Sequence, residues 1–179
     1  MPHRIRRRRR GGVHPAVAAA MAGLALAALA RPAVTGTSHR AAAVSGSAAT
    51  AIAYARAQLG KPYVWGGAGP DGFDCSGLVM QAYAAAGIWI PRTSQEQWAR
   101  GPHVPASQAR PGDLVFFAGS DGTATAPGHV GLVIGAGQMI EAYATGYPVR
   151  ISAYGTASSP AGDQDPVGFT DPAAHPGAS

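Results

Sequence analysis

The sequence predicts an α+β domain in which helices are followed by an antiparallel sheet. Two stretches in the first half of the chain, 48–59 and 75–86, are typical of helices, and each ends at a glycine. The short apolar runs that are typical of strands come later, at 114–117, 130–134, 138–143 and 149–151. Because helices and strands do not alternate along the chain, the order favours α+β over a parallel βαβ sheet.

Three helices are expected. The stretch 48–59 is rich in alanine and contains no glycine or proline, a composition that favours a helix. The stretch 75–86 repeats apolar residues at the spacing of one helix face, and Asp74 stands at its N-cap position. A shorter helix is expected at 93–100, after the break that Pro91 introduces.

The strands are predicted from apolar runs bounded by turn residues. A Pro-Gly-Asp turn at 111–113 precedes the first run. The second and third runs are separated only by Gly-Ala-Gly at 135–137, which predicts a hairpin with a three-residue loop. Together with the run at 149–151 and a short one at 167–169, they bring the expected sheet to about five strands.

Charge is distributed unevenly along the chain. The 179 residues carry a formal charge of +5, but eight of the 14 basic residues and none of the nine acidic ones lie in residues 1–40. An arginine-rich segment at 4–10 is followed by an apolar run at 16–30, which ends in the small-x-small pattern Ala-Leu-Ala at 28–30. This arrangement predicts a secretory signal peptide over residues 1–30. The alternative is an uncleaved membrane anchor, although this run is shorter than the roughly 20 residues that a spanning helix needs. We therefore expect a secreted or cell-envelope protein.

The rest of the chain divides into a flexible linker at 31–46, one folded domain at 47–154 and a tail at 155–179. The tail is rich in Ser, Pro, Gly, Ala and Asp, so we expect it to be mostly disordered apart from the short strand at 167–169. Residues 41–179 carry six basic and nine acidic side chains, a formal charge of −3. The overall basicity therefore does not indicate a nucleic-acid partner.

Cys75 is the single cysteine of the chain. One thiol excludes an intramolecular disulfide and any cysteine-built zinc or iron–sulfur cage, and the histidines lack metal-ligand spacing, so we expect no metal and no other cofactor. Cys75 stands at the start of a predicted helix, where free N–H groups and the helix dipole favour thiolate over thiol. It is a candidate nucleophile, with an intermolecular disulfide or a buried inert thiol as the alternatives.

His129 is the candidate base, since it stands at the head of a predicted strand. If the hairpin loop has three residues, Ile134 pairs with Gln138 and His129 lies opposite Tyr143. Glu141 then lies diagonally across from His129 on the same face, roughly 7–8 Å away, where it can orient the imidazole. The alternative is an outward-facing strand glutamate, and a one-residue bulge would place the two side chains on opposite faces.

Five short motifs stand out between residues 48 and 152: Gly60–Gly67, Asp74–Gly77, Pro91–Ser94, Pro111–Leu114 and Gly128–Gly131. In sequence and order they resemble motifs of the NlpC/P60 family of cell-wall cysteine peptidases. This resemblance implies a compact papain-like fold with the cysteine on a helix and the histidine on a sheet. It also implies hydrolysis of peptide bonds in peptidoglycan stems, typically the bond from D-glutamate to diaminopimelate.

The resemblance implies a role for each matching residue. Cys75 corresponds to the nucleophile and His129 to the base. Glu141 falls where many members carry a third histidine, and a carboxylate suits the same orienting role. Tyr63 matches a tyrosine that contacts the substrate or stabilises the oxyanion through its hydroxyl.

The remaining matches concern substrate binding and stability. Asp74 and Ser76 match positions that in some members hold the free amine of an L-alanine stem, with helix capping as the alternative. Arg92 and Ser94 match a motif that shapes the pocket or contacts the substrate. Three further residues are assigned to the stability of the fold: Trp65, Asp113 and Phe116.

The expected protein is a monomeric endopeptidase whose partner is the peptidoglycan stem peptide, with membrane contact only through an uncleaved leader. One alternative is an N-acetylmuramoyl-L-alanine amidase like those of the related CHAP group, which would use the same nucleophile and base. The other is a catalytically inactive wall-binding protein. The masses of the reaction products distinguish an endopeptidase from the amidase. The reactivity of the Cys75 thiol distinguishes an enzyme from the inactive wall-binding protein.

Overall fold

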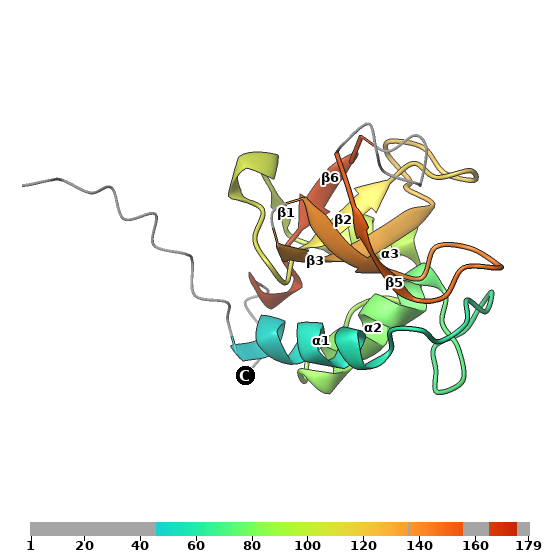
Figure 1. Ribbon diagram of the computed structural model, residues 1–179. Helices are drawn as coiled ribbons and strands as arrows, with labels where there is room; N and C mark the ends of the chain where they lie inside the picture. Colours follow the sequence, from blue (N-terminus) through green and yellow to red (C-terminus); the bar gives the residue numbers. More distant parts are fainter. Residues whose placement is uncertain (1–45, 136, 156–164, 175–179) are drawn as a thin grey trace, which may run out of the picture. The chain divides into compact units, whose positions relative to one another are not determined.

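The computed structural model of the protein describes residues 46–135, 137–155 and 165–174. These residues form three α-helices, six strands and two short 3₁₀ turns (Figure 1). The helices are α1 (Gly46–Ala57), α2 (Cys75–Ala85) and α3 (Ser94–Arg100). The strands are β1 (His103–Val104), β2 (Leu114–Phe117), β3 (His129–Gly135), β4 (Gln138–Glu141), β5 (Arg150–Ala153) and β6 (Gly168–Thr170). The predicted α+β class is confirmed.

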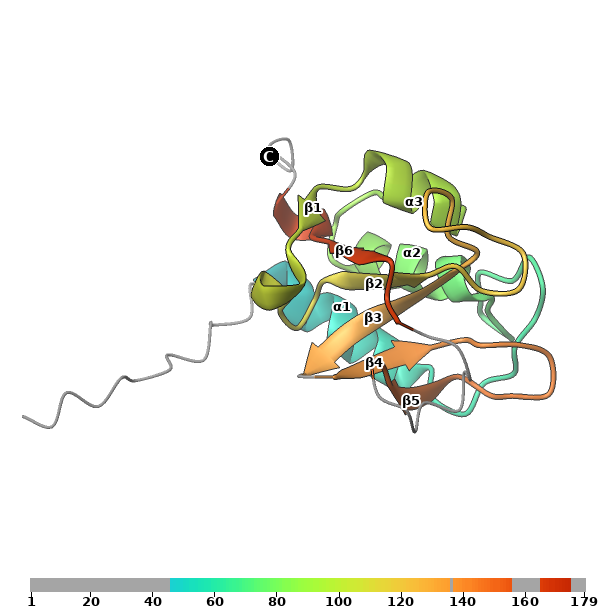
Figure 2. The same ribbon diagram turned by 90° about the horizontal axis from the view of Figure 1, so that it is seen from above.

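In the described part of the chain the strands form one antiparallel sheet in the order β1-β6-β2-β3-β4-β5 (Figure 2). Helices α1 and α2 cover one face of this sheet. Because side chains alternate along a strand, Leu114 and Phe116 of β2 join the core beneath the helices. Val115 and Phe117 join a second apolar cluster on the opposite face. The strand run predicted at 114–117 is therefore buried on both faces.

Small side chains let α1 and α2 pack closely. Ala51 and Ala55 of α1 are fully buried against α2, where Tyr83 is also fully buried. The Tyr83 hydroxyl donates a hydrogen bond to the carbonyl of Gly112, in the turn before β2. Gly112 has a positive φ of 105°, and any side chain there would collide with Ala48. The turn, α1 and α2 thus hold one another in place.

The β3–β4 hairpin differs from the predicted one at its tip. Gly135, rather than Ile134, pairs with Gln138, because the register shifts between Val133 and Gly135. On the sheet side of this irregularity Leu132 pairs with Ile140, which is the predicted register. The extra residue lies on the loop side, so it does not change which side chains meet at the other end of the hairpin.

The C-terminal part of the chain contributes more to the sheet than its composition indicates. β6 lies between β1 and β2 and pairs with both, with Phe169 buried in the second apolar cluster. The short strand predicted at 167–169 is present one residue later, whereas β1 was not predicted from the sequence. The pairing of β6 with β2 compensates for the weak local strand propensity.

The predicted signal peptide (1–30) lies outside the described residues, as does the linker up to residue 45, and α1 begins at Gly46. Residues 156–164 and 175–179 of the predicted tail also lie outside. Among the residues that the structure describes, none of the helices has the length and apolar character to cross a membrane.

We expect Phe169→Ala to lower the free energy of unfolding by about 3–5 kcal/mol, because it empties a buried site between β1 and β2. Urea unfolding followed by circular dichroism measures the change. Asp165→Ala, at an exposed position before β6, is the control and should leave the midpoint unchanged. Equal midpoints for the two variants would mean that β6 does not support the sheet.

Candidate active site

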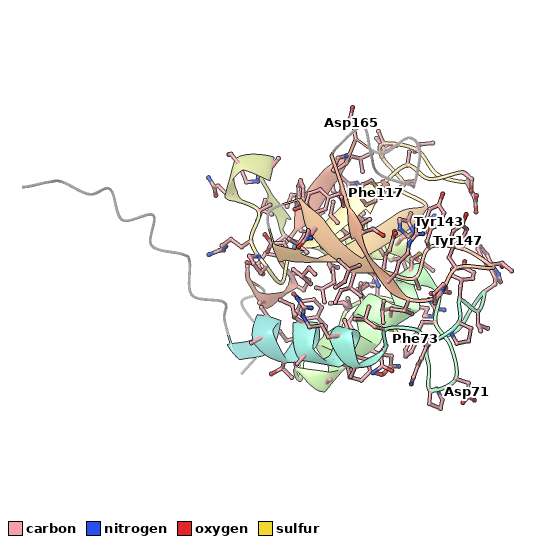
Figure 3. All side chains as sticks on the ribbon, in the orientation of Figure 1. Asp71, Phe73, Phe117, Tyr143, Tyr147 and Asp165 are labelled. Atoms are coloured by element: carbon pink, nitrogen blue, oxygen red, sulfur yellow. The ribbon has the colours of Figure 1, made fainter. Side chains whose placement is uncertain are left out.

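A groove of about 640 Å³ runs between the start of α2 and the adjoining end of the sheet. Cys75, the first residue of α2, lies on its wall, and so does His129, the first residue of β3. Tyr143 also lines the groove, after the end of β4. Figure 3 shows Tyr143 beside Tyr147, and their ring centroids are 5.5 Å apart. The groove therefore joins the helical layer to the sheet.

Cys75 is half-buried, with its sulfur 4.0 Å from the carbonyl oxygen of Gly128. Its helix begins at a tight junction, since a side chain on Gly77 would collide with the carbonyl oxygen of Gly67. Glycine at position 77 thus allows the loop before α2 to pack against the helix start. This contact and the N-cap fix where the thiol lies.

His129 and Glu141 form a buried pair, with His129 Nε2 2.8 Å from Glu141 Oε2. Because Glu141 engages Nε2, the second ring nitrogen, Nδ1, is the one available to the thiol. Burial alone would lower the pKa of His129, but the neighbouring Cys75 and the paired Glu141 outweigh it and raise this pKa to about 9. His129 and Glu141, which the predicted hairpin register places on the same face of the sheet, are therefore in contact.

Glu141 is fully buried and has further partners on β5. Its Oε1 accepts hydrogen bonds from Arg150 Nε at 3.1 Å and from Ser152 Oγ at 2.5 Å. Burial would raise the pKa of Glu141, but His129, Ser152 and Arg150 together lower it. The Arg150 guanidinium also lies over the rings of Tyr143 and Tyr147, at 4.9 and 4.8 Å from their centroids. Glu141 is thus held ionised and in one orientation.

Arg150 and Ser152 were not predicted from the sequence. Both lie on β5, where Arg150 pairs directly with Glu141 and Ser152 is two residues further along the same face. A basic and a hydroxyl residue at i and i+2 in the predicted strand near 149–151 were the available signal. The pairing of β4 with β5 was needed to use it.

Asp74 is engaged on both carboxylate oxygens. Oδ1 accepts from the backbone of Gly77 at 2.7 Å, and Oδ2 from that of Gly66 at 3.0 Å. The Arg92 guanidinium donates to both oxygens, at 3.0 and 2.6 Å, and to Ser76 Oγ at 3.0 Å. A hydrogen bond to Asp74 is the main cause that raises the pKa of Arg92. The cluster joins the helix start, the preceding loop and the segment before α3.

Three other residues singled out from the sequence line the groove, and two lie in the core. Tyr63 lines the groove, and its pKa is raised, first by burial and then by the neighbouring Cys75. Trp65 also lines the groove with 79% of its surface exposed, so its assignment to fold stability is wrong. Ser94 lines the groove too, but it is buried and donates to the carbonyl of Pro127 at 2.9 Å.

Two residues assigned to fold stability lie in the core. Phe116 is fully buried beneath α1 and α2. Asp113 is buried in the turn before β2, where it accepts a hydrogen bond from the backbone of Arg110 at 2.7 Å. Burial raises the pKa of Asp113 to about 6. Among the described residues, no three His, Cys, Asp or Glu side chains cluster in a way that could hold a metal ion.

The sequence pattern of the NlpC/P60 family matches residues 60–160, more than half of the chain. The chain belongs to the NlpC/P60 family. The resemblance seen in its motifs is thereby confirmed.

Relatives and solved structures agree with this assignment. A probable endopeptidase p60 of Listeria welshimeri is 50% identical over 95 residues, which cover 53% of this chain and 17% of the relative. The peptidoglycan hydrolase RipB of Mycobacterium tuberculosis is 36% identical with a TM-score of 0.56, covering 69% of this chain and 63% of RipB. An NlpC/P60 family protein of Bacillus cereus is 33% identical with a TM-score of 0.61, covering 69% and 39%. This chain thus spans less than a fifth of the Listeria relative's length.

We expect Glu141→Gln to lower the pKa of His129 from about 9 toward its ordinary value of 6.5, because the variant removes the facing negative charge. NMR titration of the histidine ring measures this shift. Glu96→Gln, an exposed carboxylate on α3, is the control and should leave the titration of His129 unchanged.

The same contact makes stability depend on pH. The pKa of His129 is higher in the folded than in the unfolded chain. The stabilisation that the protonated His129 contributes to the folded state is therefore complete below about pH 6.5 and is lost as the pH rises through about 9. The Glu141→Gln variant should show a smaller fall in the free energy of unfolding over that range. An equal fall in both proteins would contradict the coupling.

Proposed function

We propose that this chain is a peptidoglycan endopeptidase that hydrolyses stem-peptide bonds through Cys75, His129 and Glu141. The observation that carries the proposal is the buried His129–Glu141 pair at 2.8 Å, which leaves one imidazole nitrogen for the thiol in an open groove. Membership of the NlpC/P60 family and the likeness to the peptidoglycan hydrolase RipB support the substrate class.

In the proposed reaction the Cys75 thiolate attacks the carbonyl carbon of the scissile amide, and the carbonyl electrons move onto oxygen. When the tetrahedral intermediate collapses, the C–N bond breaks and the protonated His129 gives its Nδ1 proton to the leaving amine. Water then attacks the thioester while His129 takes up the proton, which releases the acid and restores the thiolate. Glu141 holds the ring in place and stabilises its charged form.

The developing oxyanion needs hydrogen-bond donors at the N-terminal end of α2. The backbone N–H of Cys75 is one, since the first N–H groups of a helix have no partner within it. The hydroxyl of Tyr63, which lines the same groove, is the second. Donors of this kind commonly contribute about 3–4 kcal/mol of transition-state stabilisation each.

We propose the bond from D-glutamate to diaminopimelate as the site of cleavage, in the cell wall and outside the cytoplasmic membrane. The implied role of Asp74 in binding a free L-alanine amine is not part of this proposal, because Arg92 neutralises that carboxylate at 2.6 Å. We therefore propose that stems whose L-alanine is still amide-linked to the sugar are accepted.

Replacing the nucleophile tests the reaction. We expect Cys75→Ala to lower kcat by about 10⁴-fold or more, because no other thiol is present. Mass spectrometry of muropeptides digested by the protein and by the variant measures this and identifies the bond. Intact stem peptides freed from the sugar would point to an amidase instead, and cleavage that survives the substitution would overturn the mechanism.

Arg92 tests the substrate preference. We expect Arg92→Gln to shift the ratio of kcat/KM toward stems with a free L-alanine amine by about tenfold or more, since hydrogen bonds to charged groups are worth about 1.5–3 kcal/mol. Paired assays with sugar-linked and free-amine stems measure the ratio. Arg92→Lys keeps the positive charge beside Asp74 and is the control. An unchanged ratio in Arg92→Gln would mean that Asp74 does not meet this part of the substrate.

A further inference from the structure

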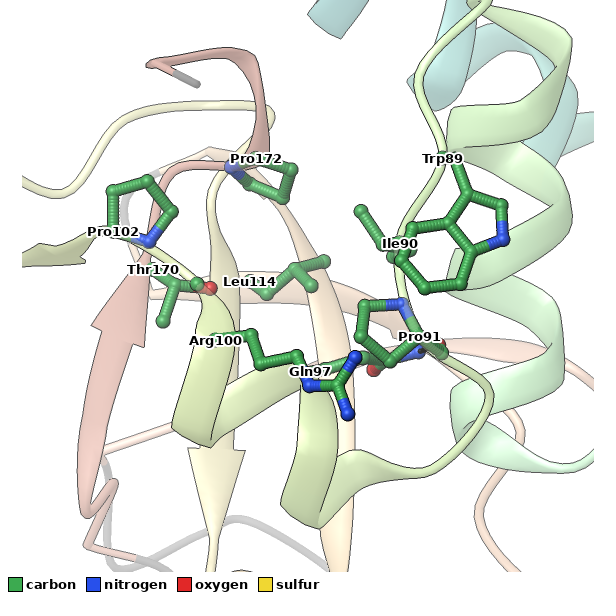
Figure 4. Close-up of a pocket in the computed structure, with 10 residues that line it drawn as sticks. Trp89, Ile90, Pro91, Gln97, Arg100, Pro102, Leu114, Thr170 and Pro172 are labelled. Atoms are coloured by element: carbon green, nitrogen blue, oxygen red, sulfur yellow. Dashed lines mark hydrogen bonds between the residues drawn. The ribbon is translucent and has the colours of Figure 1, made fainter. Parts of the chain in front are cut away.

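A second cavity of about 300 Å³ lies between the segment that follows α2 (89–91), helix α3 and strands β2 and β6. In Figure 4 Pro102 and Thr170 lie on one side of it and Trp89 and Ile90 on the other, with Leu114 between them. None of its lining residues lines the catalytic groove. Its volume is at the lower end of the range of small-ligand pockets, about 300–1,000 Å³.

Gln97 presents an unused acceptor at this cavity. The side chain is 2% exposed, and its Nε2 donates to two carbonyl oxygens, of Ser76 at 3.1 Å and of Pro91 at 2.8 Å. Because only the amide nitrogen can donate to two carbonyls, the orientation of the amide is determined. In the described part of the chain its Oε1 has no hydrogen-bond partner. A buried acceptor without a donor is costly, so this atom favours a ligand that carries an N–H.

Thr170 presents a second unused polar atom on the other side. It is fully buried, and its Oγ1 also lacks a hydrogen-bond partner among the described residues. Its backbone lies between His103 of β1 and Leu114 of β2, so the strand cannot turn this hydroxyl toward solvent. The hydroxyl can donate to an anionic oxygen that enters the cavity.

The rim and the walls complete the recognition chemistry. The Arg100 guanidinium lines the cavity, and its only ion pair in the described part of the chain is an exposed one with Glu96 at 3.5 Å. An exposed pair of this kind is weak, so Arg100 can meet an incoming anion. The walls formed by Trp89, Ile90 and Leu114 are apolar. A ligand that matches this cavity therefore carries one apolar side chain, one N–H donor and one carboxylate.

We propose that this cavity binds the carboxyl terminus of a peptide whose last residue is apolar. The amide N–H of that residue donates to Gln97 Oε1, and its side chain packs on Leu114. Its carboxylate meets Arg100 and accepts from the Thr170 hydroxyl. A simple fatty acid supplies the carboxylate but no N–H, which is why a peptide terminus fits better. The proposal does not rest on the proposed hydrolysis, and the cavity and the groove share no lining residue.

Titration of the full chain with N-acetyl-leucine tests the proposal, read out by tryptophan fluorescence, because Trp89 is 75% exposed at the cavity. We expect saturable binding. Two matched probes remove one group each: 4-methylpentanoate lacks the N–H, and N-acetyl-leucinamide lacks the carboxylate. Each should bind about tenfold more weakly. Equal affinity of all three probes, or no saturable binding, would overturn the proposal, and water would then satisfy the two polar atoms.

Variants locate the binding. Thr170→Val and Arg100→Gln should each weaken N-acetyl-leucine binding severalfold, whereas Glu96→Gln, which frees Arg100 from its ion pair, should not. Thr170→Val replaces an unpaired buried hydroxyl with a methyl group of similar size, so its thermal unfolding temperature should not fall. Unchanged affinity in both variants would refute the site. Cys75→Ala should bind the probe normally, which separates this result from any failure of the proposed hydrolysis.

Discussion

A carboxylate with no exposed surface determines the geometry of the proposed catalytic groove. Removing an ionised carboxylate from water costs several kcal/mol unless charged and hydrogen-bonding partners replace the solvent. Glu141 finds these partners on two neighbouring strands, His129 on β3 and both Arg150 and Ser152 on β5. All of them meet only if β3, β4 and β5 keep a single register. The contacts of Glu141 therefore fix the register of these three strands and the orientation of the proposed base, His129, together.

The proposed nucleophile, Cys75, is held by a separate set of contacts on the helical side. Asp74 caps α2 and is paired with Arg92, and this pair also holds the loop that precedes the helix. Gln97 adds a link, because its amide holds the carbonyl of Ser76, the residue after Cys75. Thiol and imidazole thus come from two independently supported layers that meet at the groove. Packing of α2 on β3 sets how they face each other.

The hairpin shows how far local reasoning reaches. A glycine-rich three-residue loop and the period of two along a strand placed His129 and Glu141 on one face, and the contact exists even though the pairing of Ile134 was wrong. No such reasoning was available for Arg150 and Ser152, because residues 142–149 separate β4 from β5 and no short turn sets their register. Trp65 was assigned to the stability of the fold, whereas its loop leaves the ring exposed at the groove.

The sequence by itself determined the order of the elements, the helix cap at Asp74 and the proposed nucleophile and base, because these depend on neighbours within a few residues. It also carried the motifs of the NlpC/P60 family. Only the tertiary structure decided that Arg92 neutralises Asp74, that β6 lies inside the sheet and that Gln97 and Thr170 share a cavity. Each of these joins segments distant in the chain. Such contacts depend on how layers pack and on where buried polar atoms find partners, and neither is set by local sequence.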